Sequence, residues 1–363
     1  MTYENKSEKS VALLELGAAH AECLHTQIHY LTSNGYRVHL ICDNITWTRI
    51  KETNLLAGVQ IHSADNSLFH QFALLLKIHF YIRQQRISRL VFNTTEINVV
   101  RNLFLISFPK ILNITGILHN AEKLVDGRSI RYIVGKRMQK FFLLSEYLKE
   151  KFEPLTDFKL SVFYPVYFPP FTICPIEKST DEFWITIPGG VNPTRKDYTG
   201  LLTCLLKEVL HPKIKLIFLG ASDARIYPEI DALLAQTKLR ETQILTFTGF
   251  VEYDVFHSYI AKSDLIMPLI HPYRDGFYRD SRISGAFNLS FAYKIPLLVE
   301  ESMQKWTDLQ GAAFYYRAEN IVQVFNSLIE RKLEVEQMKK TMAQDCRWKE
   351  EHLMRKYLEF IEL

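Results

Sequence analysis

The sequence predicts an α/β protein with two parallel-sheet domains, and three observations support this fold class. First, at 363 residues the chain is longer than one hydrophobic core usually supports, so two domains of roughly 150 to 180 residues are expected. Second, short apolar runs alternate with helical segments, as in parallel sheets covered by helices on both faces. Third, the stretch YPVYFPPFTICPIEKSTD (164–181) concentrates prolines and lacks periodicity, which predicts a linker.

In the first half, the apolar run VALLELG predicts a strand that ends at Gly17. A helix follows, with apolar residues at helical spacing from Ala21 to Leu31, and Asn34-Gly35 ends it before the strand YRVHLICD. This is a β-α-β unit. Further strands are predicted at RLVFN, ILNITGILHN and KFFLLS, with helical segments between them.

The second half repeats this alternation after the proline-rich stretch. The predicted strands are FWITIPG, KLIFLGA, ILTFTGFV, DLIMPLI and the run around PLLVEES, each separated from the next by a helical segment. From GAAFYYRAEN onward the chain is predicted to be largely helical, and the segment 347–363 is amphipathic. Two Rossmann-like domains in tandem follow from this order.

Composition narrows the class of protein. Hydrophobic residues make up 47% and charged residues 23%, which excludes a disordered chain. No apolar segment reaches the ~20 residues of a membrane span, and the polar N-terminus fits no signal peptide or presequence. The five cysteines form no CxxC pair, which favours a reducing compartment over a disulfide framework. We therefore expect a soluble, cytoplasmic protein.

The charge is unevenly distributed. Net charge is only +4, which argues against a nucleic-acid partner, but residues 1–168 carry 20 Lys and Arg against 14 Asp and Glu. Much of this surplus lies in GRSIRYIVGKRMQKFF, with Arg128, Arg131, Lys136, Arg137 and Lys140. The segment is either a solvated helix face or a surface that attracts an anionic acceptor or a membrane.

Five segments of the second half occur in the order and at about the spacing of a known family: IPGGVNPTRKDYTGLL, IKLIFLGAS, LTFTGFVEYDVFHSYIAKSDLIMPLIHP, FNLSFAYKIPLLVEES and GAAFYYRAEN. In combination they resemble the nucleotide-sugar-binding domain of group 1 (family 4-like, mostly retaining) GT-B glycosyltransferases. The first half resembles the acceptor domain more loosely, through the Gly17 loop, ILHN and LLSEYLKEKF. The resemblance implies a GT-B architecture in which both sheets face an interdomain cleft.

The resemblance also implies domain boundaries and roles. An acceptor-binding domain would span 1–168 and include a crossover helix at 347–363. A linker would span 169–182, and a domain that binds the nucleotide-sugar donor would span 183–346. Hinge closure around the linker would exclude water from the activated donor.

Residues for the donor diphosphate follow from the same resemblance. Arg195 and Lys196, just beyond Gly189-Gly190, occupy the family's diphosphate positions. The resemblance implies a site without a metal ion, where fixed cations must meet the charge of the leaving phosphate, and an Arg fork and a compact Lys charge suit a pyrophosphate. On local grounds alone, RKD could equally be an ordinary charged turn.

A second contribution to diphosphate binding is expected at a helix start. Ser284, Gly285 and Ala286 would bring backbone amides and the helix dipole to the phosphates. The alternative is that Ser284 merely caps its own helix. Arg279 and Arg282 would supplement this clamp or be solvated.

The nucleotide base and the donor sugar have their own candidates. Gly249, Phe250 and Val251 lie at the strand end that contacts the base in the family, although a strand end can also be packing alone. Gly17 opens a small-residue loop that would let the donor or acceptor approach the backbone. The family usually has glycines where this chain has Ala18 and Ala19.

The catalytic candidates are His119 and Glu122. His119 matches a histidine often found near the reacting sugar, where imidazole can bond to a hydroxyl or share a developing charge. A structural histidine at a strand end is the alternative. Glu122, three residues later, would assist it or cap a helix.

The chain departs from the family at two positions. Family members usually carry two glutamates separated by seven residues, and Ser281 and Leu289 stand at the corresponding places. Asp280, Ser281 or Arg282 would then recognise the sugar, or the nucleotide would be held differently, or catalysis would be lost. Because Gly190, Arg195, Lys196 and Gly285 are all present, we favour an active enzyme.

The expected function is therefore transfer of a sugar from a nucleotide-diphospho-sugar to a glycan or lipid-linked acceptor, retaining and metal-independent, with possible peripheral contact at the inner face of the membrane. The alternative is a non-catalytic GT-B subunit that binds and stabilises a partner glycosyltransferase. A GT-B nucleotide-sugar epimerase is a weaker option, because it needs a carboxylate acid/base pair that the sequence pattern does not reveal.

Overall fold

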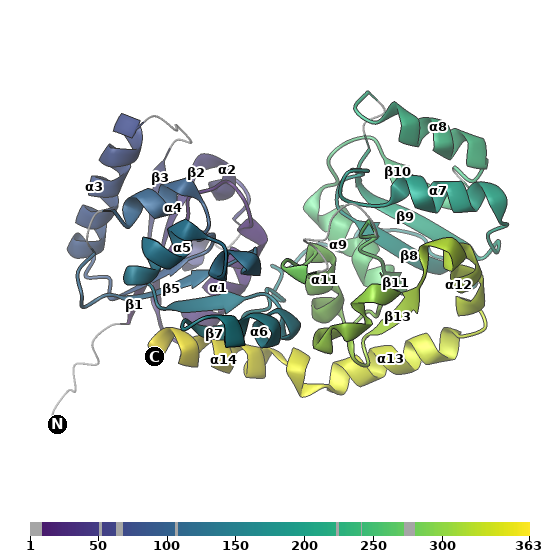
Figure 1. The fold of residues 1–363 in the computed structure, drawn as a ribbon. Helices are drawn as coiled ribbons and strands as arrows, with labels where there is room; N and C mark the ends of the chain where they lie inside the picture. Colours follow the sequence, from purple (N-terminus) through teal and green to yellow (C-terminus); the bar gives the residue numbers. More distant parts are fainter. Residues whose placement is uncertain are drawn as a thin grey trace. The chain divides into compact units, whose positions relative to one another are not determined.

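The computed structural model describes residues 9–50, 53–62, 68–105, 108–222, 225–240, 242–271 and 280–363. Its backbone contacts divide the chain into two compact units. The first comprises Met1–Pro169 and Glu350–Leu363, and the second comprises Pro170–Lys349. Figure 1 shows that each unit is a sheet covered by helices. Arg279, a candidate for the phosphate clamp, lies outside the described residues.

The first unit contains a seven-stranded sheet in the order β3-β2-β1-β4-β5-β6-β7, in which every pairing is parallel. Its strands are β1 (Ser10–Glu15), β2 (Arg37–Asp43), β3 (Gly58–His62), β4 (Arg89–Phe92), β5 (Asn113–Ile117), β6 (Lys140–Leu143) and β7 (Lys159–Val162). The central strands are buried along almost their whole length, as expected where helices cover both faces.

Short helices and turns connect these strands. The α-helices are α1 (Ala21–Ser33), α2 (Asn44–Trp47), α3 (Leu68–Gln84), α4 (Asn98–Leu103), α5 (Arg128–Tyr132), α6 (Glu146–Phe152) and α14 (Glu350–Glu362). The 3₁₀ helices include η2 (Ala121–Leu124) and η3 (Val134–Lys136). Helix α1 ends where Gly35 adopts a left-handed φ of 75°, which is the predicted stop.

The second unit contains a six-stranded parallel sheet in the order β10-β9-β8-β11-β12-β13. Its strands are β8 (Phe183–Pro188), β9 (Ile214–Ala221), β10 (Ile244–Phe247), β11 (Leu265–Ile266), β12 (Leu297–Glu300) and β13 (Ala313–Tyr316). The α-helices are α7 (Tyr198–Lys207), α8 (Pro228–Thr237), α9 (Tyr253–Lys262), α11 (Gly285–Tyr293), α12 (Ile321–Leu328) and α13 (Lys332–Gln344). We expected the chain to be largely helical from GAAFYYRAEN onward. Instead, AFYY of that segment forms strand β13, which pairs with β12.

The proline-rich stretch packs on the second unit. The Cys174 amide donates to Ser258 Oγ at 2.9 Å, and Lys178 Nζ forms a 2.5 Å ion pair with the buried Asp264. The residues expected as a linker (169–182) are therefore, from Pro170 onward, part of the second unit.

Helix α14 completes the first unit. Its Tyr357 ring stacks on Phe142 of β6, with centroids 5.1 Å apart, and Lys140 Nζ donates to the carbonyl of Phe360 at 3.2 Å. Trp348, which the sequence assigned to the crossover helix, instead stacks on Phe291 of the second unit at 3.8 Å. The crossover segment thus begins at Glu350 rather than at residue 347.

The basic segment 128–140 does not form one continuous charged surface. Arg137 donates to the carbonyls of Pro109 and Leu112, and Lys140 is buried against the end of α14. Among the five basic residues of the segment, Arg128, Arg131 and Lys136 are exposed. Within the described ranges, no helix is long and apolar enough to cross a membrane.

Candidate functional site

In both units the strand order changes direction at one point. In the first unit β1 lies between β2 and β4, and in the second β8 lies between β9 and β11. At such a point the loops after the two neighbouring strands run to opposite sides, which opens a crevice at the carboxyl ends. Gly17 follows β1, and Gly190, Arg195 and Lys196 follow β8. The candidates at 280–286 follow β11, the neighbour of β8.

A buried carboxylate, Glu15, organises the strand ends of the first unit. Its Oε1 accepts from the Gly17 amide at 2.9 Å, and its Oε2 accepts from Asn93 Nδ2 at 2.6 Å and Thr94 Oγ1 at 2.7 Å. Burial raises the pKa of Glu15, although these bonds oppose the shift. The sequence analysis missed this residue, yet a lone charge inside the apolar run VALLELG was a usable signal.

The loop after β1 is held in an unusual backbone conformation. Ala18 and His20 both adopt left-handed φ angles, 54° and 56°, which non-glycine residues seldom do. The Ala18 amide donates to Asp43 Oδ2 at 3.0 Å, and the His20 carbonyl accepts from Asn93 Nδ2 at 3.0 Å. Of the two alanines that stand where the family usually has glycines, Ala18 thus keeps a left-handed, glycine-like backbone.

This turn places His20 against the predicted catalytic residue His119. Their rings stack with centroids 3.5 Å apart and planes 10° from parallel. His119 Nε2 lies 2.8 Å from the Asn93 carbonyl, which can only accept, so Nε2 carries the proton and Nδ1 is the acceptor. The structure therefore brings Gly17, His20 and His119 together.

The two imidazoles have opposite charge preferences. Burial, together with the charge of His20, lowers the pKa of His119 to about 3. Burial would also lower the pKa of His20, but the hydrogen bond and charge of Glu22, with the charges of Glu15 and Glu96, outweigh burial and raise it. At neutral pH His119 is therefore a neutral hydrogen-bond acceptor.

Glu96 is a third carboxylate in this cluster that the sequence analysis did not find. Its Oε1 accepts from the amides of His119 at 2.9 Å and Asn120 at 3.0 Å, and its Oε2 is buried with no hydrogen bond among the described residues. Burial raises the pKa of Glu96. It follows the triplet Asn93-Thr94-Thr95, whose polar residues directly after an apolar strand were the available signal.

Glu122, the second catalytic candidate, lies in the first turn of η2. The cap of that helix is not Glu122 but Asn120, whose side chain accepts from the Glu122 amide at 3.2 Å. The carboxylate of Glu122 is half-buried. A catalytic role for Glu122 stays a prediction.

In the second unit, a close-packed glycine turn follows β8. Gly189 has a φ of +88°, and a Cβ on Gly220 would lie 2.4 Å from the Gly189 carbonyl carbon. Only glycines allow this approach of two strand ends. Gly190 follows and is exposed.

Lys196 folds back onto this turn. Its Nζ donates to the carbonyls of Pro188 and, at 3.1 Å, Gly189. No carboxylate pairs with it in the part of the chain that the structure describes, and burial lowers its pKa to about 7. The Asp197 amide bonds to the Leu269 carbonyl at 3.0 Å, which ties the loop after β8 to the loop after β11.

Arg195 lies beside Lys196 with an exposed side chain. Its amide donates to the Asn192 carbonyl at 3.2 Å, which fixes the turn but leaves the guanidinium in solvent. Two cations therefore lie at the carboxyl end of β8: Lys196, packed against the glycine turn, and Arg195, exposed to solvent.

At the start of α11, Ser284 acts as the N-cap, because its Oγ accepts from the Ala286 amide at 3.3 Å. A Cβ on Gly285 would meet no atom of the described residues within 4 Å. Ala286 is buried. Ser284 therefore caps α11, as the alternative interpretation of the sequence predicted. A contact between this helix end and a phosphate stays a prediction.

The three base-binding candidates after β10 differ in their exposure to solvent. Phe250 is 86% exposed, whereas Val251 is buried. Gly249 is exposed, and a Cβ there would meet no described atom within 4 Å. Phe250 is therefore the one side chain of the three that can stack on a base, at the edge of the sheet away from β8.

The three consecutive residues expected to recognise the sugar in place of the missing glutamates have different surroundings. Asp280 pairs with Lys305 at 3.0 Å, Ser281 is buried, and Arg282 is half-buried just before α11. Leu289 is 7% exposed in α11 and packs inward. Across the described ranges, no three or more His, Cys, Asp or Glu residues are grouped so as to hold a metal ion.

No protein-family model and no curated protein sequence matches the chain. Solved structures do resemble it. A glycosyltransferase from Rickettsia africae is 12% identical, with 98% of each chain covered and a TM-score of 0.68. HepE from Anabaena, solved with UDP-glucose, is 13% identical, with 97% of this chain and 99% of that chain covered and a TM-score of 0.68.

A putative UDP-N-acetylglucosamine 2-epimerase from Listeria monocytogenes is also similar, at 12% identity and a TM-score of 0.64, with 98% of this chain and 96% of that chain covered. At such identities the likeness concerns the fold. The chain has the architecture of GT-B glycosyltransferases, with two α/β units whose sheets are entirely parallel.

Proposed function

We propose that this protein transfers a sugar from a nucleotide-diphospho-sugar to a glycan or lipid-linked acceptor. The carrying observation is Lys196, which packs against the carbonyls of Pro188 and Gly189 at the reversal point of the second sheet. An ammonium without a described carboxylate partner and with a pKa lowered to about 7 gains most from an anion. A diphosphate supplies that anion.

We propose that the reaction needs no metal ion because fixed cations take its place. Negative charge develops on the leaving diphosphate, and fixed positive groups lower the barrier most where no solvent must reorganise. Lys196 would bind the diphosphate from its place against the glycine turn, and the exposed Arg195 would bind it from the solvent side. Gly190 and the Gly285 end of α11 offer backbone amides to the same group.

His119 would serve the donor sugar. Because it is neutral and its Nε2 is bonded to the Asn93 carbonyl, its Nδ1 can accept a hydrogen bond from a sugar hydroxyl. We propose a retaining outcome, in which this contact orients the sugar while the acceptor attacks. The protein would work in the cytoplasm, with the acceptor presented at the inner face of the membrane.

Donor binding is the first test. Purified protein is titrated with UDP, GDP, ADP and dTDP and their sugars while the melting temperature is followed, with UDP-glucose first because HepE was solved with it. One nucleotide should raise the melting temperature, and Lys196→Ala should abolish the rise. Lys207→Ala, an exposed lysine on α7, is the matched control.

If no nucleotide stabilises the protein, the transferase proposal fails and the non-catalytic subunit becomes the better account. Slow hydrolysis of the stabilising donor, measured as release of free sugar, then separates an active enzyme from a binding module. The Lys196→Ala variant should show no hydrolysis, and the Lys207→Ala variant should match the wild type.

One observation favours a second candidate, a nucleotide-sugar epimerase. Glu96 and Glu22 both act on the His20–His119 pair, and the pKa of Glu96 is raised by burial. These are the carboxylates that an acid/base exchange at a sugar carbon requires. Incubation with UDP-N-acetylglucosamine in D₂O, without acceptor, would place deuterium at C2 if this candidate is correct, and a transferase would leave that carbon unlabelled.

A further inference from the structure

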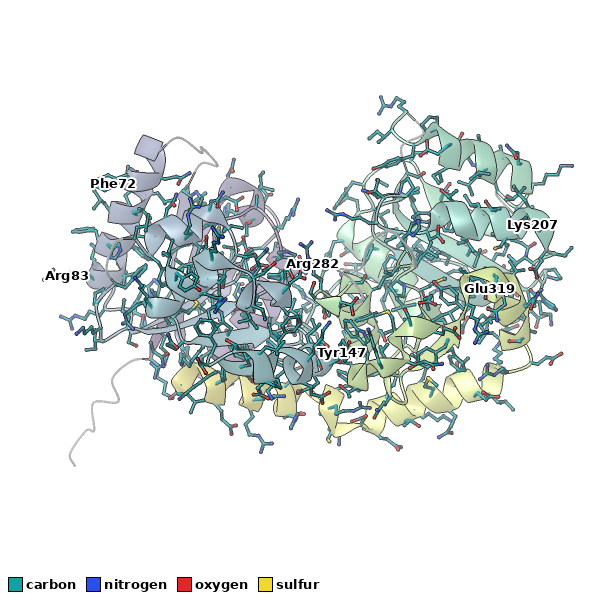
Figure 2. The ribbon with its side chains drawn as sticks, in the orientation of Figure 1. Phe72, Arg83, Tyr147, Lys207, Arg282 and Glu319 are labelled. Atoms are coloured by element: carbon teal, nitrogen blue, oxygen red, sulfur yellow. The ribbon has the colours of Figure 1, made fainter. Side chains whose placement is uncertain are left out.

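Helix α3 exposes an apolar face. Phe72, Leu76 and Phe80 are spaced by four residues and are 54%, 52% and 70% exposed. Figure 2 shows Phe72 on the outer side of α3, away from the sheet. The opposite side of the helix is buried through Leu75, Ile78 and Ile82 among others. A helix that is apolar on both sides is unusual at a water-exposed surface.

The chain around this face is almost without acidic residues. From Asn66 to Ala121 the single acidic residue is Glu96, whose Oε1 is bonded to two backbone amides. Six basic residues occur in the same stretch: Lys77, Arg83, Arg86, Arg89, Arg101 and Lys110. Of these, Lys77, Arg83, Arg86 and Lys110 are exposed. The apolar face is therefore bordered by cations.

A neighbouring loop extends this surface. The Phe108 ring stacks on His79 of α3, with centroids 4.5 Å apart. Lys110 and the 87% exposed Ile111 follow in the chain. Arg137 holds this loop through the carbonyls of Pro109 and Leu112, at 2.6 and 2.9 Å. The half-buried Arg137 of the basic segment thus holds Lys110 and Ile111, another basic and apolar pair, beside α3.

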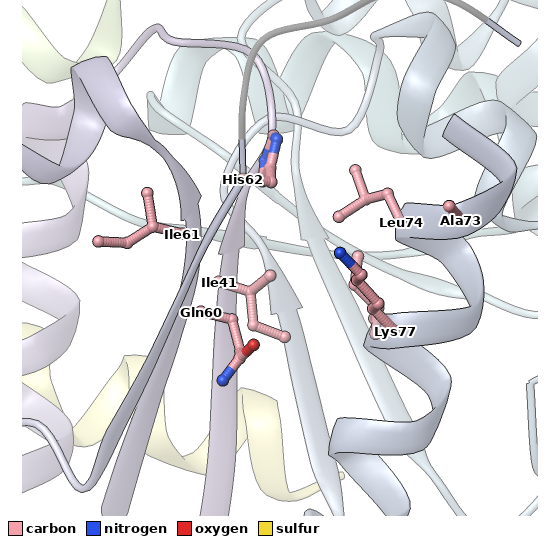
Figure 3. A pocket seen from close by; sticks show the side chains of 8 residues that line it. Ile41, Gln60, Ile61, His62, Ala73, Leu74 and Lys77 are labelled. Atoms are coloured by element: carbon pink, nitrogen blue, oxygen red, sulfur yellow. The ribbon is translucent and has the colours of Figure 1, made fainter. Parts of the chain in front are cut away.

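A cavity of about 280 Å³ lies between α3 and the edge of the sheet. Ile41, Leu74 and Ile78 are among its apolar walls, and Gln60, His62 and Lys77 are its polar members. Figure 3 shows the Lys77 side chain extending from α3 toward Ile41. An anionic group that settles beside α3 would meet this ammonium above an aliphatic floor.

We propose that α3 and the loop 108–111 dock on the surface of an anionic lipid bilayer. Phe72, Leu76 and Phe80 would enter the boundary between headgroups and acyl chains, as interfacial helices do. Lys77, Arg83 and Lys110 would meet lipid phosphates, where the surface potential attracts them. This deepens the proposed function, because a lipid-linked acceptor lies at the same surface.

A second copy of the chain fits this face less well. The three side chains expose roughly 300 Å² together, given the 150 to 250 Å² that an aromatic side chain presents. A stable interface needs about 800 Å² from each partner. A two-fold contact would also set the bordering cations of one copy against those of the other.

Vesicle sedimentation of the full chain tests the docking. Wild-type protein is mixed with phosphatidylcholine vesicles, with or without about one third phosphatidylglycerol, at ~0.1 M salt. It should sediment with the anionic vesicles. The triple variant Phe72→Gln/Leu76→Gln/Phe80→Gln should bind them at least about tenfold more weakly. Leu333→Gln, 84% exposed on α13, is the matched apolar control and should bind like the wild type.

Variants that remove positive charge test which surface binds the vesicles. Lys77→Gln/Arg83→Gln/Lys110→Gln should lose most binding to anionic vesicles, whereas Arg128→Gln/Arg131→Gln should not. The proposal is overturned if the wild type sediments with neither vesicle, or if the Arg128/Arg131 variant loses as much binding as the Lys77 variant. It is equally overturned if light scattering shows a wild-type dimer that the Phe72 variant converts to monomer, because the face then serves a second copy.

The docking and the proposed activity fail separately. Nucleotide-sugar stabilisation measured without lipid should be the same in the wild type and in the α3 variants, since none of these residues belongs to the candidate site. Vesicle binding without any nucleotide response would leave the docking intact and remove the transferase proposal. A nucleotide response without vesicle binding would do the reverse.

Discussion

His20 and His119 stack face to face, with ring centroids 3.5 Å apart and planes 10° from parallel. Two charged imidazoles at this distance would repel strongly. The pair therefore takes its first proton on His20, whose pKa is raised, while the pKa of His119 falls to about 3. When the pair is protonated, its charge therefore lies on His20, and His119 stays neutral.

The His119 pKa predicts an acid-sensitive fold. Unfolded His119 binds a proton near its ordinary pKa of 6.5, whereas the folded residue does so only near 3. Protons therefore favour unfolding as pH falls from 6.5 toward 3. Urea denaturation at pH 4 and pH 7 should show the wild type losing on the order of 3 kcal/mol more than His119→Asn. The control His352→Asn should follow the wild type, and parallel curves for wild type and His119→Asn would refute the assignment.

Lys196 predicts proton uptake on donor binding. At pH 8 the free residue is mostly neutral, because its pKa is about 7, and a bound diphosphate favours the charged form. Calorimetric titration with the stabilising nucleotide-sugar, in two buffers of different ionisation enthalpy, should show uptake of close to one proton. Uptake should shrink at pH 6, where Lys196 is already charged.

The conservative variant sharpens this Lys196 prediction. Lys196→Arg carries a permanent charge, so it should retain part of the affinity while taking up no proton. Equal uptake in the wild type and in Lys196→Arg would mean that another group titrates.

Glu15 is predicted to be structural. Three donors converge on it, from Gly17, Asn93 and Thr94, and a glutamine amide would turn an NH₂ group against one of them. Glu15→Gln should lower the free energy of unfolding by about 1–3 kcal/mol. The exposed Glu319→Gln, on the second unit, should change it by less than about 0.5 kcal/mol. Equal stability of both variants would argue against a Glu15-centred cluster.

Phe250 is predicted to hold the nucleotide base. An exposed aromatic ring that stacks on a base contributes about 1–3 kcal/mol, so Phe250→Ala should weaken nucleotide binding by about tenfold or more without lowering the melting temperature of the free protein. Val209→Ala removes another highly exposed apolar side chain of the same unit and should leave affinity unchanged. An unaltered affinity of Phe250→Ala would place the base elsewhere.

Tyr357 is predicted to be essential to the first unit. Its buried ring stacks on Phe142 and contacts Phe163 at a centroid distance of 5.3 Å, and its hydroxyl donates to Gln27 at 3.1 Å. Tyr357→Ala should cost about 3–5 kcal/mol. Tyr132→Ala, at a half-exposed position of the same unit, should have little effect. Thermal denaturation followed by circular dichroism distinguishes the two.

The sequence was enough to predict the two parallel sheets, because their central strands are continuous apolar runs between helices. Strands β3 and β7 were not predicted, and both lie at a sheet edge. Each has a neighbour on one side only, so its sequence need not be apolar throughout: GVQIH is largely half-buried, and KLSV begins exposed. Strand β13 was obscured because the apolar run AFYY leads directly into helical residues.

The candidate site was predicted unevenly for a similar reason. His119 and Lys196 are visible in the sequence because family motifs surround them. Glu15, His20 and Glu96 lie 81 positions apart at the extremes, and only the adjacency of β1, β4 and β5 brings them together. The local signals were the carboxylate of Glu15 inside an apolar run and the polar residues that follow β4, and the partners of both depend on strand order.

The position of α14 in the first unit has a consequence for synthesis. Residues Glu350–Leu363 belong with Met1–Pro169, but they are translated only after the whole of Pro170–Lys349. Until α14 leaves the ribosome, the apolar side of β6 around Phe142 has no cover, while the second unit already has all its strands. The first unit made would therefore be the last to complete its core, and it would need protection from aggregation during that interval.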